Sequence, residues 1–154
     1  MERYSHIYEE GKGGGRMGIF KTLIVEDNAS FRNTLLDILS AQFPSIAIEE
    51  AADGKEALQK VDSFQPHLIF MDIKLPGENG LHLTQKIKAK YPEVVVIILT
   101  SYDLPEYREA AFRYGANHFI VKGSSTNQEI LALVESISKE SGFTLSATQG
   151  RNDS

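Results

Sequence analysis

The sequence predicts an α/β fold with a single doubly wound, five-stranded parallel sheet in the strand order 2-1-3-4-5. Short runs rich in Ile, Val and Leu alternate with longer segments of helical period from residue 20 onward. Three of the runs are almost continuously hydrophobic, as is typical of strands covered by helices on both faces. The chain has 154 residues, 42% of them hydrophobic, which suits a single core.

Five strands are expected, at residues 20–25, 46–51, 67–71, 94–99 and 118–121. The run "VVVIIL" at 94–99 is too short to cross a bilayer and is typical of a buried strand, so we expect no membrane association. Right-handed crossovers between these strands make the sheet parallel and open.

Five helices are expected to follow the strands in turn. The first has Asn28 or Ser30 as its cap and apolar residues at helical spacing: Phe31, Leu35, Ile38 and Leu39. The second starts near Gly54, the third ends before Pro92, and the fourth ends at Gly115. The fifth starts at Thr126 or Asn127 and ends at Gly142.

This pattern predicts one domain at 19–142 between two short flanking segments. Residues 1–18 lack the apolar block of a signal peptide and contain "GKGGG", so we expect a flexible extension or tag. The glycines do not form a phosphate-binding loop, because no Gly-Lys-Ser/Thr follows at the required spacing. Residues 143–154 are expected to be a frayed polar tail.

Composition excludes several classes of function. The formal net charge of −5 argues against nucleic-acid binding by this chain alone, because a phosphate backbone requires clustered Lys and Arg. There is no cysteine, which excludes disulfides and thiolate metal sites, and we expect a cytoplasmic protein.

Polar residues follow the predicted strands at the points where the strands end. Glu26 and Asp27 follow the first strand, Asp72 the third, Thr100 the fourth and Lys122 the fifth. Each taken singly is an ordinary helix cap or surface residue. The carboxyl ends of parallel strands meet at one edge, however, so we expect all five side chains to lie close together.

Such an arrangement is electrostatically unbalanced. Three carboxylates and one ammonium leave a charge of about −2, which Mg²⁺ would neutralise with oxygen ligands. Asp72 is the candidate nucleophile for phosphoryl transfer, because it lies where the strand order reverses and Pro76-Gly77 keeps the following segment from crowding it.

Four motifs, "LIVEDN", "MDIKLPGENG", "ILTS" and "GANHFIVK", make residues 20–140 resemble the receiver domain of two-component response regulators, which has a flavodoxin-like fold. The resemblance implies that Asp72 accepts a phosphoryl group from a sensor histidine kinase or phosphotransfer protein. It also implies that Glu26, Asp27, Asp72 and the backbone carbonyl of Lys74 hold Mg²⁺.

The resemblance further implies a conformational switch. Thr100 is expected to turn toward the phosphoryl group, Lys122 to pair with it, and Phe119 to rotate inward unless it is simply a core aromatic. The surface that changes would be the face of the fourth helix, fifth strand and fifth helix, through which we expect homodimerisation.

The sequence departs from the family pattern at three places. Glu26 replaces the commoner Asp, so we expect it to reach the metal through water. Gly123 follows Lys122 where many receivers have proline, so we expect a trans peptide bond and a more mobile loop. Lys74 and Tyr102 occupy the variable positions that tune how long the phosphoryl group survives, and bulky Tyr102 is expected to hinder water.

Several alternatives stay open. The chain can be the receiver part of a helix-turn-helix DNA-binding regulator, or a receiver-like interaction module that is not phosphorylated. An aspartate-based phosphatase would need a second aspartate where Lys74 stands, and a flavin site would need a Ser/Thr/Gly-rich loop in place of "EDNAS". We therefore expect a signalling domain, not an enzyme.

Overall fold

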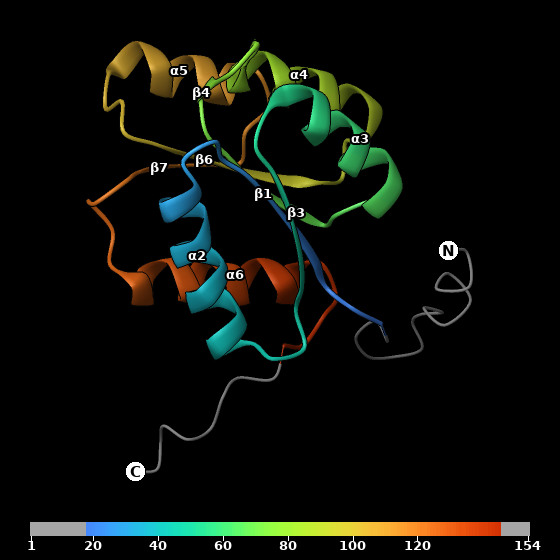
Figure 1. Ribbon diagram of the computed structural model, residues 1–154. Helices are drawn as coiled ribbons and strands as arrows, with labels where there is room; N and C mark the ends of the chain where they lie inside the picture. The colour runs from blue at the N-terminus through green and yellow to red at the C-terminus, as the bar shows by residue number, and fades with distance from the viewer. Residues whose placement is uncertain (1–17, 146–154) are drawn as a thin grey trace.

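The computed structural model describes residues 18–145, which form one parallel sheet between two layers of helices (Figure 1). The sheet contains β1 (Lys21–Val25), β2 (Ala47–Ala51), β3 (Leu68–Met71), β6 (Val95–Thr100) and β7 (His118–Val121). Its order is β2-β1-β3-β6-β7, with all neighbouring pairs parallel. This is the predicted order 2-1-3-4-5, and the predicted fold class is confirmed.

Helices cover both faces of the sheet (Figure 1), and the two core clusters show which helices pack on which face. The first face carries α2 (Ala29–Gln42) and α6 (Asn127–Glu140), and the second carries α3 (Gly54–Phe64), α4 (Gly80–Lys90) and α5 (Pro105–Arg113). A short antiparallel pair, β4 (Lys74–Leu75) and β5 (Glu78–Asn79), was not expected from the sequence. Two-residue strands are too short to produce a recognisable period.

The helix starts are fixed by side-chain caps. Asn28 caps α2, because its side-chain oxygen accepts a hydrogen bond from the Phe31 N–H at 2.9 Å. Thr126 caps α6 through a capping box in which Thr126 and Glu129 each accept a hydrogen bond from the other's backbone N–H. Of the two caps considered for each of these helices, the structure therefore has Asn28 and Thr126.

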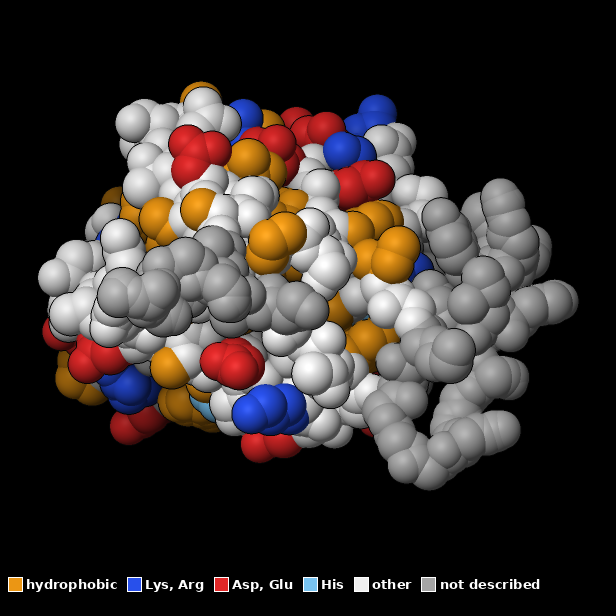
Figure 2. Space-filling model, turned by 90° about the horizontal axis from the view of Figure 1, so that it is seen from below, with side chains coloured by type: hydrophobic (Ala, Val, Ile, Leu, Met, Phe, Trp, Pro, Cys, Tyr) orange, Lys and Arg blue, Asp and Glu red, His pale blue; other side chains and the backbone are white. Residues whose placement is uncertain are grey.

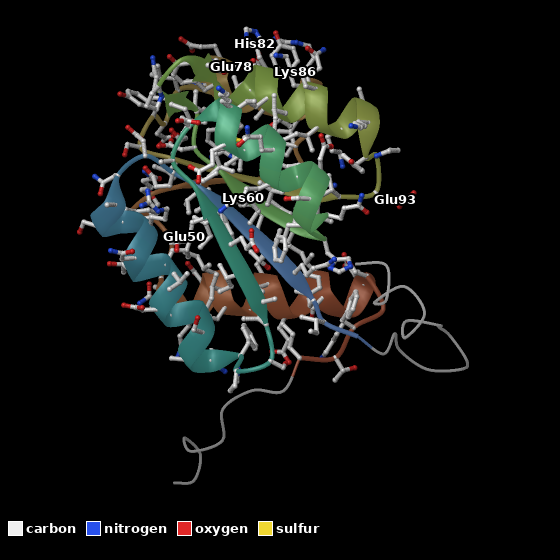
Figure 3. The ribbon with its side chains drawn as sticks, turned by 45° about the vertical axis from the view of Figure 1, so that its right-hand side comes forward. Glu50, Lys60, Glu78, His82, Lys86 and Glu93 are labelled. Carbon is white, nitrogen blue, oxygen red and sulfur yellow. The ribbon has the colours of Figure 1, made fainter. Side chains whose placement is uncertain are left out.

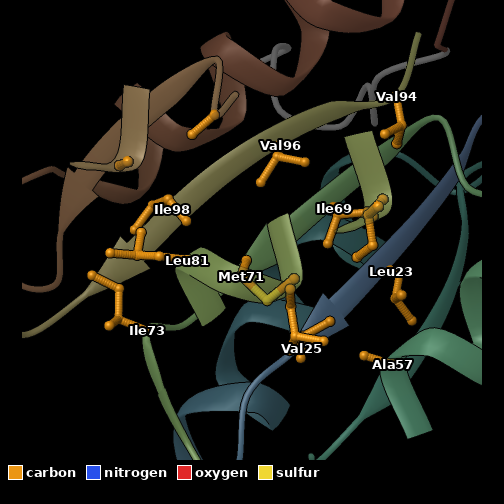
Figure 4. Packing of buried hydrophobic residues seen from close by; sticks show 14 of the residues in the cluster. Leu23, Val25, Ala57, Ile69, Met71, Ile73, Leu81, Val94, Val96 and Ile98 are labelled. Atoms are coloured by element: carbon orange, nitrogen blue, oxygen red, sulfur yellow. The ribbon is translucent and has the colours of Figure 1, made fainter. Parts of the chain in front are cut away.

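Alternating strand residues fill two separate hydrophobic cores. The first cluster lies between the sheet and α3, α4 and α5 (Figure 4), and its strand members include Leu23, Val25, Ile69, Met71, Val96 and Ile98. The second cluster lies between the sheet and α2 and α6, and its strand members include Ile24, Leu68, Phe70, Ile97 and Leu99. Because both faces are buried, the strands are rigid supports for whatever follows them.

The folded unit extends slightly past the predicted boundary at residue 142. Phe143 and Leu145 are 3% and 7% exposed and belong to the second cluster. The Phe143 ring lies 5.3 Å from the Phe20 ring and 4.5 Å from the His67 ring. The rest of the expected tail and, apart from Gly18, the expected N-terminal extension lie outside the described residues.

The surface carries charges of both signs. Lys86 pairs with Glu78 at 2.9 Å, and the Lys60 ammonium donates to the Glu50 carbonyl at 2.8 Å (Figure 3). Figure 2 looks onto the side of α2 and α6, where small hydrophobic patches lie among charged and other polar side chains. Within residues 18–145, no helix has the length and apolar character needed to cross a membrane.

Candidate functional site at the carboxyl edge of the sheet

The sheet ladder itself positions the predicted site residues. The Asp72 N–H donates to the Val25 carbonyl at 3.0 Å, and the Lys122 N–H donates to the Thr100 carbonyl at 2.8 Å. Backbone hydrogen bonding thus continues one residue past the ends of β3 and β7. It fixes the position of the Cα atoms of Asp72 and Lys122, from which their side chains extend. Carboxylate oxygens of Glu26, Asp27 and Asp72 lie within 4.8 Å of one another, and we call these three residues the acidic cluster.

Lys122 contacts two members of the acidic cluster. Its Nζ lies 2.7 Å from Glu26 Oε1 and 3.3 Å from Asp72 Oδ2. The side chains of Lys122, Glu26 and Asp72 are only 16%, 4% and 9% exposed, whereas Asp27 is exposed. The ammonium is therefore shared between two largely buried carboxylates, where the charge interaction is little screened by water.

Burial and neighbouring charges change the ionisation of this pair. Burial raises the pKa of Glu26 above its usual 4.5, the Asp72 charge adds to this, and hydrogen bonds from Lys122 and the Asn28 N–H offset only part of it. Burial on its own would lower the pKa of Lys122, but the Glu26 hydrogen bond and the charges of Asp72 and Glu26 outweigh it. The pKa of Lys122 is therefore raised, and the ammonium stays charged at neutral pH.

The backbone around Asp72 is closely packed. Asp72 Oδ1 accepts a hydrogen bond from the Ile73 N–H at 2.8 Å, and the Gly80 N–H donates to the Ile73 carbonyl at 2.8 Å. A Cβ atom at Gly80 would overlap the Asp72 carbonyl oxygen and would lie 2.9 Å from the carbonyl carbon. Glycine at position 80 therefore lets the start of α4 approach the segment that carries Asp72.

The predicted switch residues are buried near this edge. Thr100 is 0% exposed, and its hydroxyl accepts a 3.3 Å hydrogen bond from the Tyr102 N–H. Phe119 belongs to the first cluster, and the Arg108 guanidinium carbon lies 4.7 Å from its ring centroid. The peptide bond between Lys122 and Gly123 is trans, as predicted.

Lys74 and Tyr102, the two variable positions, are in contact with each other. Lys74 Nζ lies 5.0 Å from the Tyr102 ring centroid and 5.8 Å from the Tyr107 ring centroid. The two tyrosine rings meet edge to face at 6.0 Å. The side chain of Lys74 is therefore held by aromatic rings through cation–π contacts.

Two residues of α2 contribute to the site although sequence reasoning missed them. Arg32 Nη1 donates to the Glu26 carbonyl at 2.7 Å, and its Nε donates to Glu50 Oε1 at 2.8 Å. The Phe31 ring centroid lies 4.4 Å from Lys122 Nζ. Their spacing could have indicated this role. Phe31 and Arg32 lie three and four residues after Asn28, in the first helical turn after Glu26 and Asp27.

The acidic cluster has the chemistry of a divalent cation site. Its donors are all carboxylate oxygens, and their separation of at most 4.8 Å brings all three close enough to take part in one ion site, directly or through water. With Lys122 the local charge is about −2, which a divalent cation would balance. These residues therefore fit a small, hard cation.

A doubly wound five-stranded sheet with an acidic cluster and a lysine at its carboxyl edge defines a class of flavodoxin-like signalling domains. The sequence profile of the family described as "Response regulator receiver domain" matches residues 22–135. This chain belongs to that family, and it is the receiver domain of a response regulator of a two-component system.

Known proteins place the chain within this family. It is 40% identical over 114 residues to the oxygen regulatory protein NreC of Staphylococcus haemolyticus, covering 73% of this chain and 52% of that protein. The chain thus spans about half the length of the curated relatives it matches. A CheY-like receiver domain protein from Methanospirillum hungatei has a TM-score of 0.74 and 27% identity, covering 80% of this chain and 97% of that one. A LuxR-family response regulator from Aurantimonas has a TM-score of 0.72 and 25% identity, covering 82% and 90%.

Proposed function

We propose that Asp72 accepts a phosphoryl group from a histidine of a sensor kinase or phosphotransfer protein. The observation that carries this proposal is the placement of Asp72, which directly follows the central strand β3, has carboxylate oxygens of Glu26 and Asp27 within 4.8 Å, and has the Lys122 ammonium 3.3 Å from its Oδ2. One carboxylate is thus held rigidly among groups that can compensate the charge of an incoming phosphoryl group.

In the proposed reaction, a carboxylate oxygen of Asp72 attacks the phosphorus atom. The new bond between this oxygen and phosphorus forms as the bond from phosphorus to the donor imidazole nitrogen breaks, and the leaving imidazole takes up a proton. Lys122 pairs with a phosphoryl oxygen, and the Thr100 hydroxyl donates to another. Both Asp72 oxygens have a donor, the Ile73 N–H on Oδ1 at 2.8 Å and the Lys122 ammonium on Oδ2 at 3.3 Å, and these contacts orient the carboxylate for attack.

We further propose that Mg²⁺ is held by Asp27, Asp72 and the backbone carbonyl of Lys74, with Glu26 contributing through water. When bound, this ion supplies positive charge that offsets the transferring oxygens. Both Glu26 oxygens already have partners, Lys122 on Oε1 and the Asn28 N–H on Oε2. This occupancy supports an indirect role for Glu26. Pairing of Lys122 with a phosphoryl oxygen, as proposed above, would require the ammonium to loosen from Glu26.

The output is proposed to be a change on the face of α5, β7 and α6. Movement of Thr100 toward the phosphoryl group would leave space that Phe119 fills by rotating inward. Leu104 and Phe112 are 44% and 47% exposed at α5 and its start, so apolar surface is available for a homodimer on this face. The two states need to differ by only a few kcal/mol for one covalent bond to shift the balance.

A second proposal concerns the context of the domain. NreC is about twice as long as the match, and the Aurantimonas structure is described as LuxR-family. We propose that this receiver can serve as the regulatory part of a longer DNA-binding regulator, without itself contacting nucleic acid. We place the phosphoryl exchange in the cytoplasm and propose no enzymatic turnover beyond it.

Intact-mass measurement after incubation with Mg²⁺ and phosphoramidate tests the proposed function. Wild-type protein is expected to gain one phosphoryl group, and Asp72→Asn none. Chelation of Mg²⁺ should suppress the gain in wild type. An equal gain in wild type and Asp72→Asn would overturn the assignment of Asp72.

A further inference from the structure

The Lys122 ammonium has a third partner besides Glu26 and Asp72. Its Nζ lies over the ring of Phe31, 4.4 Å from the centroid. Phe31 is half-buried on α2, in the first turn after the Asn28 cap. The cation is thus enclosed between two carboxylates and the face of an aromatic ring, and with 16% of the Lys122 side chain exposed the contact is largely shielded from water.

An aromatic ring acts on this ammonium differently from a carboxylate. Its attraction arises from the ring quadrupole and carries no net charge, so it neither neutralises the cation nor competes with a phosphoryl group. During transfer Lys122 has to exchange the Glu26 oxygen at 2.7 Å for a phosphoryl oxygen. Phe31 is the one of its three partners in the described structure that has no part in this exchange.

A pocket beside the Phe31 ring offers the Lys122 side chain an alternative position. Phe31 and Lys122 line a pocket of about 220 Å³ whose other walls are mainly apolar: Leu35, Ile38, Leu99, Ile120 and Ile130. Gly123, in the same wall, has a φ of 86° and no side chain to fill the space. The same pocket is also lined by the polar residues Thr34, Ser125 and Asn127, so without the ring the lysine side chain could turn away from Asp72 toward them.

We propose that Phe31 is a positioning residue that keeps the Lys122 ammonium beside Asp72 while its anionic partners change. This inference rests on the proposed function of Asp72. In this proposal Phe31 acts through its contact with Lys122 and takes no part in the bond changes at Asp72.

Three variants separate the aromatic face from simple packing. Phe31→Leu keeps an apolar side chain but removes the ring, and Phe31→Tyr keeps the ring. Leu36→Ala is the matched control, because Leu36 is equally half-buried on α2 and packs on the same core but does not line the pocket. If Phe31→Leu fails to fold, trifluorophenylalanine at position 31 replaces it, since fluorination weakens the quadrupole at nearly constant shape.

The rate of phosphorylation by phosphoramidate with saturating Mg²⁺ is the first measurement. We expect the second-order rate constant to fall roughly three- to thirtyfold in Phe31→Leu, which is a cation–π contact of roughly 0.7–2 kcal/mol converted at about 1.4 kcal/mol per tenfold. Phe31→Tyr should recover most of the rate, and Leu36→Ala should match wild type. Equal rates in wild type and Phe31→Leu would overturn the inference.

NMR of the Lys122 side chain is the second measurement and does not depend on phosphorylation. The ring current of Phe31 should shift the Lys122 Hε signals upfield in wild type and Phe31→Tyr but not in Phe31→Leu. Unshifted signals in wild type would contradict the contact itself. If wild type shows the shift but gains no phosphoryl group, the function proposed for Asp72 fails while the contact stands.

Discussion

Replacing Lys122 by methionine would leave two buried carboxylates without their cation. Glu26 and Asp72 contact the ammonium at 2.7 and 3.3 Å and are 4% and 9% exposed in their side chains. Removing one partner of a buried ion pair typically costs about 3–5 kcal/mol. Because Lys122 is 16% exposed and methionine retains most of its apolar stem, we expect a loss of about 2–4 kcal/mol in the free energy of unfolding at neutral pH without metal.

The same substitution should strengthen Mg²⁺ binding. The local charge becomes about −3 instead of −2, and Glu26 Oε1 loses its competing partner. One unit charge at about 5 Å is worth roughly 3 kcal/mol at an effective dielectric constant of 20. Screening near the exposed Asp27 side reduces this to about 1–2 kcal/mol, so the Kd for Mg²⁺ should fall roughly tenfold.

The stability loss should also depend on pH, with a definite sign. The folded-state pKa of Glu26 is already above its usual 4.5, so protonation of Glu26 favours the folded state at low pH and this contribution is lost as the pH rises through the raised pKa. Without Lys122 the folded-state pKa rises further, because a hydrogen bond that lowers it is gone. The difference between wild type and variant should therefore be largest at neutral pH and should shrink toward pH 4.5.

Urea denaturation with and without Mg²⁺, at several pH values, measures all three effects. Lys86→Met is the control, because Lys86 forms a comparable 2.9 Å pair with Glu78 but is 56% exposed. It should change stability by less than about 1 kcal/mol at any pH. If Lys122→Met is as stable as wild type at neutral pH and binds Mg²⁺ no more tightly, the electrostatic account of the site is refuted.

Three further substitutions test other parts of the structure. Gly80→Ala should lower the free energy of unfolding by about 1–3 kcal/mol in urea denaturation, because the added Cβ would overlap the Asp72 carbonyl oxygen. An unchanged urea midpoint would contradict the packing described around Gly80. Thr22→Val should raise the free energy of unfolding by about 1 kcal/mol in thermal denaturation, since the Thr22 hydroxyl is buried with no hydrogen-bond partner among residues 18–145 and valine has the same shape; destabilisation would argue for a bonded hydroxyl. Tyr102→Ala should shorten the lifetime of the phosphorylated protein, followed as loss of the added mass, because it opens the site to water; equal lifetimes would sink this expectation.

The strand order and layers of the fold were predictable because they follow from short sequence patterns, namely apolar runs that alternate with helical segments. Uninterrupted apolar runs such as 94–99 are typical of strands buried on both faces, and their alternation with helices leaves few possible topologies. The β4 and β5 pair was not predictable, because it depends on contacts within a loop. Burial of Phe143 and Leu145 was missed because two apolar residues in a polar tail show no period.

The proximity of Glu26, Asp27, Asp72 and Lys122 was predictable from the sequence, but their individual contacts were less so. The ends of the strands indicate that Asp72 and Lys122 lie at the same edge of the sheet. In the structure, Lys122 Nζ lies 3.3 Å from Asp72 Oδ2. That Lys122 also binds Glu26 depends on side-chain rotamers, which the sequence does not specify. The contribution of Phe31 depends on how α2 packs across the sheet edge, which is a tertiary property.

Phe143 fixes the last part of the described chain beside Phe20 and His67, which precede β1 and β3. That rim of the sheet is opposite to the one that carries Asp72. β6 has six residues, so about 20 Å of sheet separate the two rims. Leu145, the last described residue, is therefore far from the phosphorylation proposed at Asp72, and a change at Asp72 would reach this rim only through the layers between them. The proposed phosphorylation site and the end of the described chain thus lie at opposite rims of the sheet, so a substitution at one need not disturb the packing at the other.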